Sequence, residues 1–365
     1  MVEIKEINFI NFRNLDDFNI KFESGFNLFH GKNGQGKTSI LEAIYFTATG
    51  KSFRTSKVVE LIKYNNDKCG TYIAFKDREG KKNLTVKFND KKKDYNFNGK
   101  KVSHEEFFGK INVVIFIPED IELITGSPSV RRKFFDEEIS QAQNEYYINL
   151  KNYNKILKIR NQYLKEKKTK EEIFSIYENE FITLAGKIVL NRMEYMKNIG
   201  IILNLNYRKI FDDKKELGLS YISNIEYSRK DTLKEIEFKI SEEIKKQTLL
   251  EKKYGYSLVG PQRDEFKFLL DGKDAKSYSS QGEKKSIVFS LKLSEIDMIF
   301  REKKENPIFI IDDISSYFDS NRKKNILEYL KKREIQLFIS STEEIEIQNK
   351  KFKIEKGKIQ EEFIW

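Results

Sequence analysis

The chain has 365 residues, enough for one large domain or two with a sizeable core, and its single cysteine excludes a disulfide framework and a thiolate zinc site. Its formal net charge of +11, from 68 lysines and arginines against 57 aspartates and glutamates, is as compatible with a polyanionic partner as with a solvated lysine-rich surface. No apolar run is long enough to span a bilayer and the first residues lack an apolar signal region, so we expect a cytoplasmic protein with no membrane association.

Three short apolar stretches near the start of the chain predict strands. Residues 2–12 alternate roughly between apolar and polar side chains and predict an edge strand or the first strand of a sheet. Residues 18–22 repeat this pattern. Residues 26–30 are apolar and aromatic, which is typical of a buried parallel strand, and residues 39–46 predict a helix.

A complete phosphate-loop pattern, G-x-x-x-x-G-K-[ST], lies between this strand and this helix. The loop consists of Gly31, Lys32, Asn33, Gly34, Gln35, Gly36, Lys37 and Thr38. Its glycines let the backbone turn N–H groups toward a polyphosphate, and the helix N-terminus adds a partial positive charge. We predict that Lys37, on the solvent side of the loop, reaches the β- and γ-phosphates and that Thr38 binds Mg²⁺. A glycine-rich turn without a ligand is the weaker alternative.

The region after the first helix is polar and rich in turn signals. A loop with two cations, Lys51 and Arg54, comes first. Residues 71–102 then predict three short strand-like runs, separated by turns at 77–80, 89–90 and 98–99. Lysines gather in this region, and we favour a solvated hairpin rim over a nucleic-acid contact for them. These lysines are Lys91, Lys92, Lys93, Lys100 and Lys101.

The middle of the chain predicts helices. Residues 113–117 are a further buried strand, which ends at Pro118. From residue 131 to about residue 250, apolar residues recur at helical spacing, and the charged segment 165–172 is typical of a connection between helices. We therefore expect three parts: residues 1–130, a helical subdomain of residues 131–250, and residues 251–365.

The last part returns to strands and turns. Residues 266–270 and the following Asp-Gly turn predict a hairpin, and a helix follows Ser280. Residues 308–311 predict a buried strand that ends in Asp312 and Asp313. A helix over 322–332, a strand over 336–339 that runs into 340–342, and a final hairpin turning at Gly357 complete the prediction.

Polar residues at strand ends indicate a ligand site, because ligands of open α/β sheets bind beyond the carboxyl ends of the strands. Asp312 suits a carboxylate that meets a Mg²⁺ ion held by Thr38, and Asp313 could position the attacking water. A turn or helix cap is the alternative for both carboxylates. Ser280, before a helix N-terminus, predicts a second anion site, with a purely local cap as its alternative.

Together these motifs resemble the RecF family of recombination ATPases, and the resemblance spans essentially the whole chain. The segments that carry it are residues 11–15, 31–38, 50–54, 118–120, 131–132, 260–264, 280–282 and 312–313. It implies an α/β fold, an ABC-type ATPase head with a mixed sheet and an inserted helical subdomain. Such a head is similar to those of SMC proteins but lacks their long coiled coil.

The resemblance also implies roles for individual residues. Lys37, Thr38 and Asp312 would bind ATP and Mg²⁺, with Thr38 and Asp312 as the metal ligands. Asp313 takes the place of the hydrolytic carboxylate. Ser280, with Gly282, would be the signature serine that reaches the nucleotide of the opposing protomer. Residues 340–342 lie where related ATPases place a γ-phosphate switch residue.

Several residues depart from the family pattern. Glu283 stands where glutamine is usual and Gln262 where histidine is usual. Residues 316–319 read Ser-Tyr-Phe-Asp in place of Ser-Glu-Leu-Asp, so we expect the loop that crosses the dimer to differ in detail. The only histidines are His30 and His104, so no histidine switch follows the last strand.

The resemblance implies a slow, DNA-associated ATPase that acts as a recombination mediator in DNA replication and repair. It would bind single-stranded, gapped or duplex DNA, form a homodimer with ATP, and help load the recombinase at gaps with RecO and RecR, with a link to SOS induction. Lys51 and Arg54 are candidate DNA contacts, with a structural loop as the alternative. A nuclease with an ABC head is disfavoured, because only about fifty residues follow Asp313. A regulatory ABC-type ATPase that acts on protein partners without DNA stays open.

Overall fold

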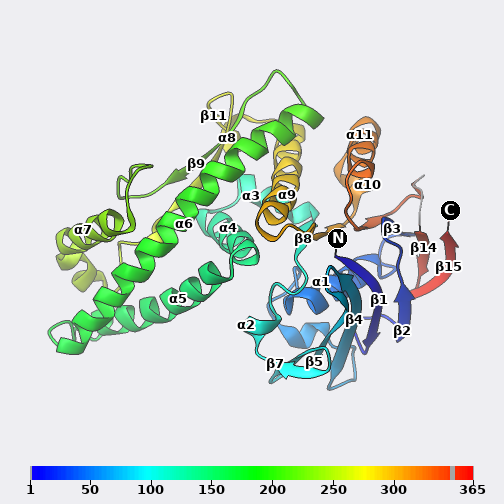
Figure 1. Cartoon of the computed structure of the whole chain (residues 1–365), viewed down its shortest axis with the longest axis horizontal. Coiled ribbons are helices and arrows are strands. Elements are labelled where there is room, and N and C mark those ends of the chain that lie inside the picture. Colours follow the sequence, from blue (N-terminus) through cyan, green and yellow to red (C-terminus); the bar gives the residue numbers. More distant parts are fainter. Residues whose placement is uncertain (1, 346–349, 365) are drawn as a thin grey trace. The chain divides into compact units, whose positions relative to one another are not determined.

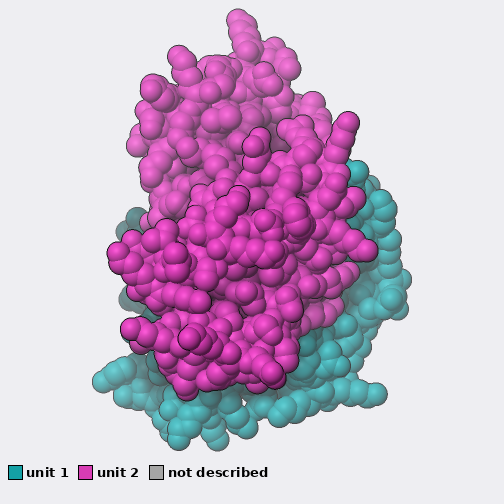
Figure 2. All heavy atoms as spheres, turned by 90° about the vertical axis from the view of Figure 1, so that its left-hand side faces the viewer, with its two compact units in different colours: residues 1–120, 291–365 teal, residues 121–290 magenta. Residues whose placement is uncertain are grey.

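Residues 2–345 and 350–364 are described from a computed structural model of the chain (Figure 1). The chain forms two compact units, one of residues 1–120 with 291–365 and one of residues 121–290 (Figure 2). The boundaries after residues 130 and 250 that the sequence suggests stay a prediction. Among the described residues, no helix combines the length and the apolar character needed to cross a membrane.

An antiparallel sheet in the first unit has the strand order β2-β1-β4-β5-β6-β7. Its strands are β1 (Glu3–Ile10), β2 (Phe18–Lys21), β4 (Cys69–Asp77), β5 (Gly80–Phe88), β6 (Lys93–Phe97) and β7 (Lys100–Val102). Of the two alternatives for residues 2–12, the structure has the first strand of a sheet and not an edge strand, because β1 pairs with β2 on one side and β4 on the other. The region after residue 69 holds four strands where three runs were expected, and the turn at 98–99 joins β6 to the short β7.

A mixed sheet in the same unit has the order β15-β14-β3-β13-β12-β8. Its strands are β3 (Phe26–His30), β8 (Val113–Phe116), β12 (Ile308–Ile311), β13 (Leu337–Ser341), β14 (Lys350–Glu355) and β15 (Lys358–Ile364). The prediction of a buried parallel strand before the phosphate loop is confirmed, since β3 runs parallel to both β13 and β14. Only β15 runs antiparallel to its neighbour, in the expected final hairpin.

Helix α1 (Lys37–Thr49) is the central helix of this unit. It contacts β4 and β5 of the antiparallel sheet and β8 and β13 of the mixed sheet. Ile40, Leu41, Ile44 and Phe46 belong to a hydrophobic cluster that includes side chains from both sheets. The helix is buried on nearly all sides, and it buries the polar residues Glu42 and Thr47 together with its apolar ones. It ends at Gly50, whose left-handed backbone (φ 72°) and N–H bond to Phe46 form a C-cap.

The remaining elements of the first unit are short. They are α2 (His104–Phe107), α10 (Ile314–Tyr317), α11 (Ser320–Lys331) and a 3₁₀ turn at Val58–Leu61. Another 3₁₀ turn, Pro118–Ile121, follows β8 at the proline where that strand was expected to end.

The second unit is mainly helical. Its helices are α3 (Glu122–Thr125), α4 (Pro128–Ala142), α5 (Asn144–Lys165), α6 (Glu172–Ile210), α7 (Leu233–Tyr254) and α8 (Ala275–Tyr278), and α9 (Gln281–Lys303) begins in it. The 39-residue α6 contacts α5, α7 and a small sheet (Figure 1). The expected connection over 165–172 is confirmed, because α5 ends at Lys165 and α6 begins at Glu172.

The small sheet corrects the expectation of a purely helical segment 131–250. It consists of β9 (Leu217–Ile222), β10 (Glu265–Leu270) and β11 (Lys273–Asp274). Antiparallel pairing aligns Leu217 with Leu270 and Ile222 with Glu265. The partner of β9 lies more than forty residues later, so the local sequence did not reveal the strand. The hairpin expected after residue 266 is confirmed as β10–β11.

Candidate functional site

The phosphate loop, residues 31–36, connects the carboxyl end of β3 to α1. Gly31, Gly34 and Gly36 have φ values of 146°, 77° and 105°, a region that favours glycine. A Cβ atom at Gly31 would clash with the carbonyl oxygen of Ile354, and one at Gly36 would lie 2.9 Å from Leu15 Cδ2. The loop therefore has the backbone shape and the tight surroundings of a phosphate cradle.

The turn between β14 and β15 supports this loop. The backbone N–H of Lys356 donates to the Gln35 side-chain oxygen at 2.7 Å, and the N–H of Gly357 donates to the Gln35 carbonyl at 2.9 Å. Gly357 has a left-handed backbone (φ 76°), and a Cβ there would lie 2.8 Å from the Asn14 carbonyl oxygen. The loop is thus fixed by residues from both ends of the first unit.

Lys37 lies inside the loop. Its Nζ donates to the carbonyl oxygens of Gly31 at 2.6 Å and Lys32 at 2.8 Å, and only 7% of the residue is exposed. The expectation of a solvent-side lysine is wrong, because the loop folds around the ammonium group. Burial lowers the pKa of Lys37, and the negative charges of Asp313 and Asp312 oppose this shift. A phosphate oxygen would be a stronger partner for this ammonium than a neutral carbonyl.

Thr38 and Asp312 meet although they are 274 residues apart. The Thr38 hydroxyl donates to both carboxylate oxygens of Asp312 at 3.0 Å. Asp312 follows the fully buried β12, and burial raises the pKa of its carboxyl group, while hydrogen bonds from Ser340 and Thr38 lower it. Hydroxyl and carboxylate oxygens are the ligands that Mg²⁺ prefers, and a cation would compensate the buried charge. The two residues fit a magnesium ion.

Asp313 is held differently from its neighbour. Its backbone is left-handed (φ 51°) and its N–H donates to the Ser340 hydroxyl at 2.8 Å. Oδ2 accepts a hydrogen bond of 2.5 Å from Ser316, whereas Oδ1 is buried with no hydrogen-bond partner among the described residues. An acceptor oxygen that is free in this way is suited to orient a water molecule.

The roles of Ser340 and Ser316 did not follow from the sequence. The Ser340 hydroxyl donates to Asp312 and accepts from the Asp313 N–H, so it fixes both carboxylates at once. Ser341 contacts Ser315 instead, at 2.7 Å between the hydroxyl oxygens. Their positions in the sequence could have indicated these roles. Ser340 lies at the end of a predicted strand, and Ser316 lies one helical turn after Asp313.

Two sequence motifs converge on Glu42 of α1, which is fully buried. Arg13 donates to both of its oxygens, at 2.9 and 2.7 Å, and Arg54 donates to one at 3.2 Å. The Lys51 ammonium lies 5.6 Å from the centroid of the Phe108 ring. Arg54 and Lys51, the candidate DNA contacts, thus have structural partners in their own unit.

Ser280 and Gly282 belong to the second unit, whereas Lys37, Thr38, Asp312 and Asp313 come together in the first. Ser280 is exposed at the start of α9. Its N–H donates to Glu283 at 2.7 Å, and its hydroxyl accepts from the Glu283 N–H at 3.2 Å, which is a capping box. Glu283 also pairs with Lys215, and its pKa is lowered to about 2 by hydrogen bonds from Lys215 and the Ser280 N–H. The unusual glutamate therefore has a structural role.

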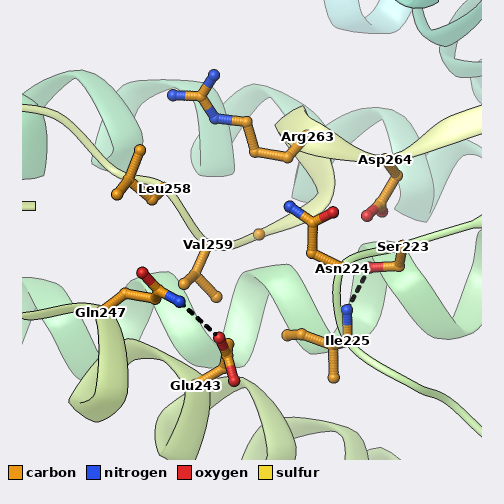
Figure 3. A pocket seen from close by; sticks show the side chains of 10 residues that line it. Ser223, Asn224, Ile225, Glu243, Gln247, Leu258, Val259, Arg263 and Asp264 are labelled. Carbon is orange, nitrogen blue, oxygen red and sulfur yellow. Dashed lines mark hydrogen bonds between the residues drawn. The ribbon is translucent and has the colours of Figure 1, made fainter. Parts of the chain in front are cut away.

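The motif over residues 260–264 is part of a buried polar network. Gln262 accepts a hydrogen bond from the Tyr153 hydroxyl, and Arg192 donates to the Pro261 carbonyl at 2.7 Å and pairs with Asp264 at 3.4 Å. This segment forms one wall of a cavity of about 540 Å³ in the second unit (Figure 3). The cavity is lined by Ser223, Asn224, Ile225, Glu243, Gln247, Leu258, Val259, Gly260, Arg263 and Asp264. None of these lining residues belongs to the phosphate loop or to the Asp312–Asp313 pair.

Comparisons with known proteins agree with this architecture. The sequence matches the family model described as RecF/RecN/SMC N terminal domain over residues 3–358. The DNA replication and repair protein RecF of Alkaliphilus oremlandii is 36% identical over 341 residues, 93% of each chain. A solved structure of the recombination mediator protein RecF with ATP in the RecFOR pathway has a TM-score of 0.92 and 34% identity, and the match covers 99% of both chains.

A more distant likeness concerns the fold alone. The Smc head domain of Pyrococcus furiosus, with an extended coiled coil and the C-terminal domain of ScpA, has a TM-score of 0.58 at 16% identity. The match covers 100% of this chain and 97% of that one. The predicted α/β fold of an ABC-type ATPase head is therefore confirmed.

Proposed function

The chain belongs to the RecF family of DNA replication and repair proteins, and on this premise we propose that it is a slow ATPase that binds DNA when ATP is bound and mediates recombination. ATP drives homodimerisation on single-stranded, gapped or duplex DNA. The dimer helps load the recombinase at gaps together with RecO and RecR in the cytoplasm. A contribution to SOS induction belongs to the same proposal.

The contact between Thr38 and Asp312 is the observation that carries the proposal. It joins the phosphate loop after β3 to the carboxyl end of β12, which is separated from β3 by β13 in the same sheet, at the 3.0 Å separations given above. The RecF structure with a TM-score of 0.92 was solved with ATP, which supports ATP as the nucleotide. Asp312 is buried and Thr38 is half-buried beside the glycine-rich loop, and a bound cation would compensate the charge of the buried carboxylate.

Each residue of the site has a distinct part in this proposal. The backbone of residues 31–36 and the Lys37 ammonium bind the polyphosphate, and Thr38 and Asp312 hold Mg²⁺. The bound ion supplies positive charge at the phosphate oxygens. Asp313 Oδ1 accepts a hydrogen bond from the attacking water. Ser280 and Gly282 contact the nucleotide of the opposing protomer.

Slow hydrolysis is proposed because of the carboxylate in position 313. Related ATPases commonly have glutamate there, and aspartate is shorter by one methylene group. A misplacement of about 1 Å can lower a rate on the order of a hundredfold. Slow turnover suits an ATP-bound dimer that has to persist on DNA.

Fluorescence anisotropy with single-stranded, gapped and duplex oligonucleotides tests the proposal, with and without ATP and at several salt concentrations. We expect binding that requires ATP and weakens steeply with salt, because lysines and arginines displace counterions from phosphates. Sedimentation velocity should show the ATP-dependent dimer. If no DNA binds in any nucleotide state, while an ATP-dependent complex with protein partners forms, the chain is a regulatory ABC-type ATPase instead.

A further inference from the structure

We propose that the outer face of the antiparallel sheet in the first unit contacts the phosphate backbone of duplex DNA, with Lys81 and Lys87 of β5 as the principal contacts. This inference rests on the proposed function, which supplies DNA as the partner. To the proposed function it adds the surface of the protein that contacts DNA, and it names duplex as the form of DNA that is bound.

Alternation along the strands separates the two faces of this sheet. The inward residues of β4 and β5, such as Ile73, Phe75, Leu84 and Val86, are buried in the hydrophobic cluster around α1. The residues between them point to the opposite face, because successive side chains in a strand alternate. On β5 this outer face carries Lys81 and Lys87 near the two ends of the strand, and both are exposed; Asn83 and Thr85 lie between them.

The charges of these lysines are not compensated within the sheet. Lys81 is the direct cross-strand partner of Lys76, and like charges opposite each other are destabilising. Glu3 of β1 lies opposite Lys76 on the other side, and so next to Lys76 rather than next to Lys81. Lys87 is opposite Asp94, but Asp94 already pairs with Lys92 at 3.2 Å and Lys101 at 2.7 Å. Within residues 2–345 and 350–364, the side chains of Lys81 and Lys87 form no ion pair. A bound polyanion would supply the missing negative charge.

Neutral donors occupy the space between the two lysines. Tyr72, Thr85 and Asn96 form one row across β4, β5 and β6. Hydroxyl and amide groups of these types commonly bond DNA phosphates together with lysine. Glu6, the nearest carboxylate on β1, already accepts hydrogen bonds of 2.9 and 2.8 Å from Asn8 and Asn19. The row across β4, β5 and β6 is thus polar and uncharged, and the Glu6 carboxylate lies on the neighbouring strand β1.

The geometry favours duplex DNA over a single strand. Lys81 and Lys87 are six residues apart on one strand, which corresponds to about 20 Å and to roughly six phosphates of one DNA strand. Single-strand sites usually stack successive bases on several aromatic rings. Among the outward residues of β1, β4, β5 and β6, Tyr72 is the one aromatic side chain. The face therefore suits a backbone contact rather than base stacking.

Three lysines near β6 and β7 have partners within the first unit. Lys92 and Lys101 pair with Asp94, and Lys93 donates to the Gly50 carbonyl at 2.9 Å and lies over the Phe46 ring. Their structural partners agree with the hairpin rim favoured from the sequence. Lys91 and Lys100 are exposed as well, in the β5–β6 turn and on β7, and Lys81 and Lys87 differ from them by their place on the outer face of β5.

The double variant Lys81→Glu/Lys87→Glu tests the surface in the full chain. With ATP and Mg²⁺ present, we expect its affinity for a labelled duplex to fall at least tenfold at moderate salt. The slope of log affinity against log salt should decrease by about two, because each phosphate contact contributes about 0.9. The thermal midpoint should change little, because the change at position 81 replaces a repulsive pair with Lys76 by an attractive one, while the change at position 87 places a like charge opposite Asp94.

A matched control carries the same change of charge elsewhere. Lys234 and Lys252 are exposed residues of α7, and Lys234→Glu/Lys252→Glu should bind duplex DNA with wild-type affinity and salt slope. If the β5 variant keeps wild-type duplex binding, or if both variants weaken equally, this surface is not a specific contact. If it loses only single-strand binding, the assignment to duplex is overturned. Failure of the wild type to bind any DNA would instead refute the proposed function.

Discussion

The Ser316 hydroxyl donates a hydrogen bond of 2.5 Å to Oδ2 of Asp313, while Oδ1 of the same carboxylate is buried and has no partner among the described residues. One oxygen is therefore fixed by the protein and the other is left for a ligand. The serine lies three residues after the aspartate, so a single turn of α10 sets the direction of the carboxylate.

Removing this hydroxyl should slow hydrolysis without weakening nucleotide binding. For Ser316→Ala we expect a fall of about tenfold or more in the single-turnover rate, because the carboxylate loses its fixed direction, and an unchanged dissociation constant for ATP. Ser316→Thr keeps the hydroxyl and should restore most of the rate. Ser315→Ala is the matched control, since its hydroxyl contacts Ser341 and not Asp313. A wild-type rate in Ser316→Ala would show that Asp313 needs no such support.

The two adjacent carboxylates should respond differently to the same change. Asp313→Asn should keep ATP and Mg²⁺ binding, lose hydrolysis and accumulate the dimer on DNA. Asp312→Asn should weaken the Mg²⁺-dependent part of ATP binding itself, because it removes a carboxylate oxygen next to Thr38. Nucleotide affinity with and without Mg²⁺, measured beside single-turnover hydrolysis, separates these outcomes. Retained hydrolysis in Asp313→Asn would end the assignment of Asp313, and with it the role of Ser316.

Lys37→Ala should abolish productive ATP binding while the protein stays folded. The change removes two hydrogen bonds to loop carbonyls, which corresponds to about 1–3 kcal/mol of the free energy of unfolding. Calorimetric titration with ATP and denaturant unfolding measure the two effects. Lys57→Ala, an exposed lysine outside the loop, is the control for the loss of a positive charge. Equal ATP affinity in the Lys37 variant and wild type would contradict the phosphate-loop assignment.

Ser280→Arg should leave ATP binding to the monomer intact and block ATP-dependent dimerisation, which sedimentation velocity with an ATP analogue measures. The substitution also removes an N-cap, worth about 1 kcal/mol. Glu283→Ala is therefore the control, because it breaks the other half of the capping box without adding bulk at position 280. A Ser280→Arg protein that still dimerises would remove Ser280 from the opposing nucleotide site.

Glu283 should make stability depend on acid pH. Its pKa is about 2 in the folded protein against an ordinary value of 4.5, because Lys215 and the Ser280 N–H favour the charged form. A carboxylate with a lowered folded pKa stabilises the fold above its unfolded pKa, and this contribution disappears as the pH falls from about 4.5 toward 2. The difference in unfolding free energy between wild type and Glu283→Gln should shrink over that range. A difference independent of pH would show that the ion pair does not contribute.

Local patterns were sufficient to predict the core of the site. The phosphate loop is a contiguous motif, and the residues directly before and after it predict the strand and the helix that flank it. Asp312 and Asp313 follow four fully buried apolar residues, so their place at a strand end was also predictable. Parallel strands bring their carboxyl ends to one edge of a sheet, which explains why Thr38 and Asp312 could be paired from the sequence.

The sequence did not predict the features that depend on partners far away in the chain. β9 becomes a strand because β10 pairs with it, and the burial of Lys37 follows from the path of the loop around it. Ser340 contacts both carboxylates only because β13 lies beside β12. The distinction between the paired lysines near Asp94 and the unpaired Lys87 likewise depends on strand register, which composition does not reveal.

The hydrogen bond from Lys356 in the β14–β15 turn to Gln35 joins residues 321 positions apart. A ribosome that synthesises this chain releases the phosphate-loop sequence long before the residues that fix its shape. Both parallel neighbours of β3, the strands β13 and β14, are also made late. Pairings of such high sequence separation form slowly, after the intervening chain has been ordered. The growing polypeptide thus completes its nucleotide site only after β13, β14 and the turn at Lys356 and Gly357 have emerged.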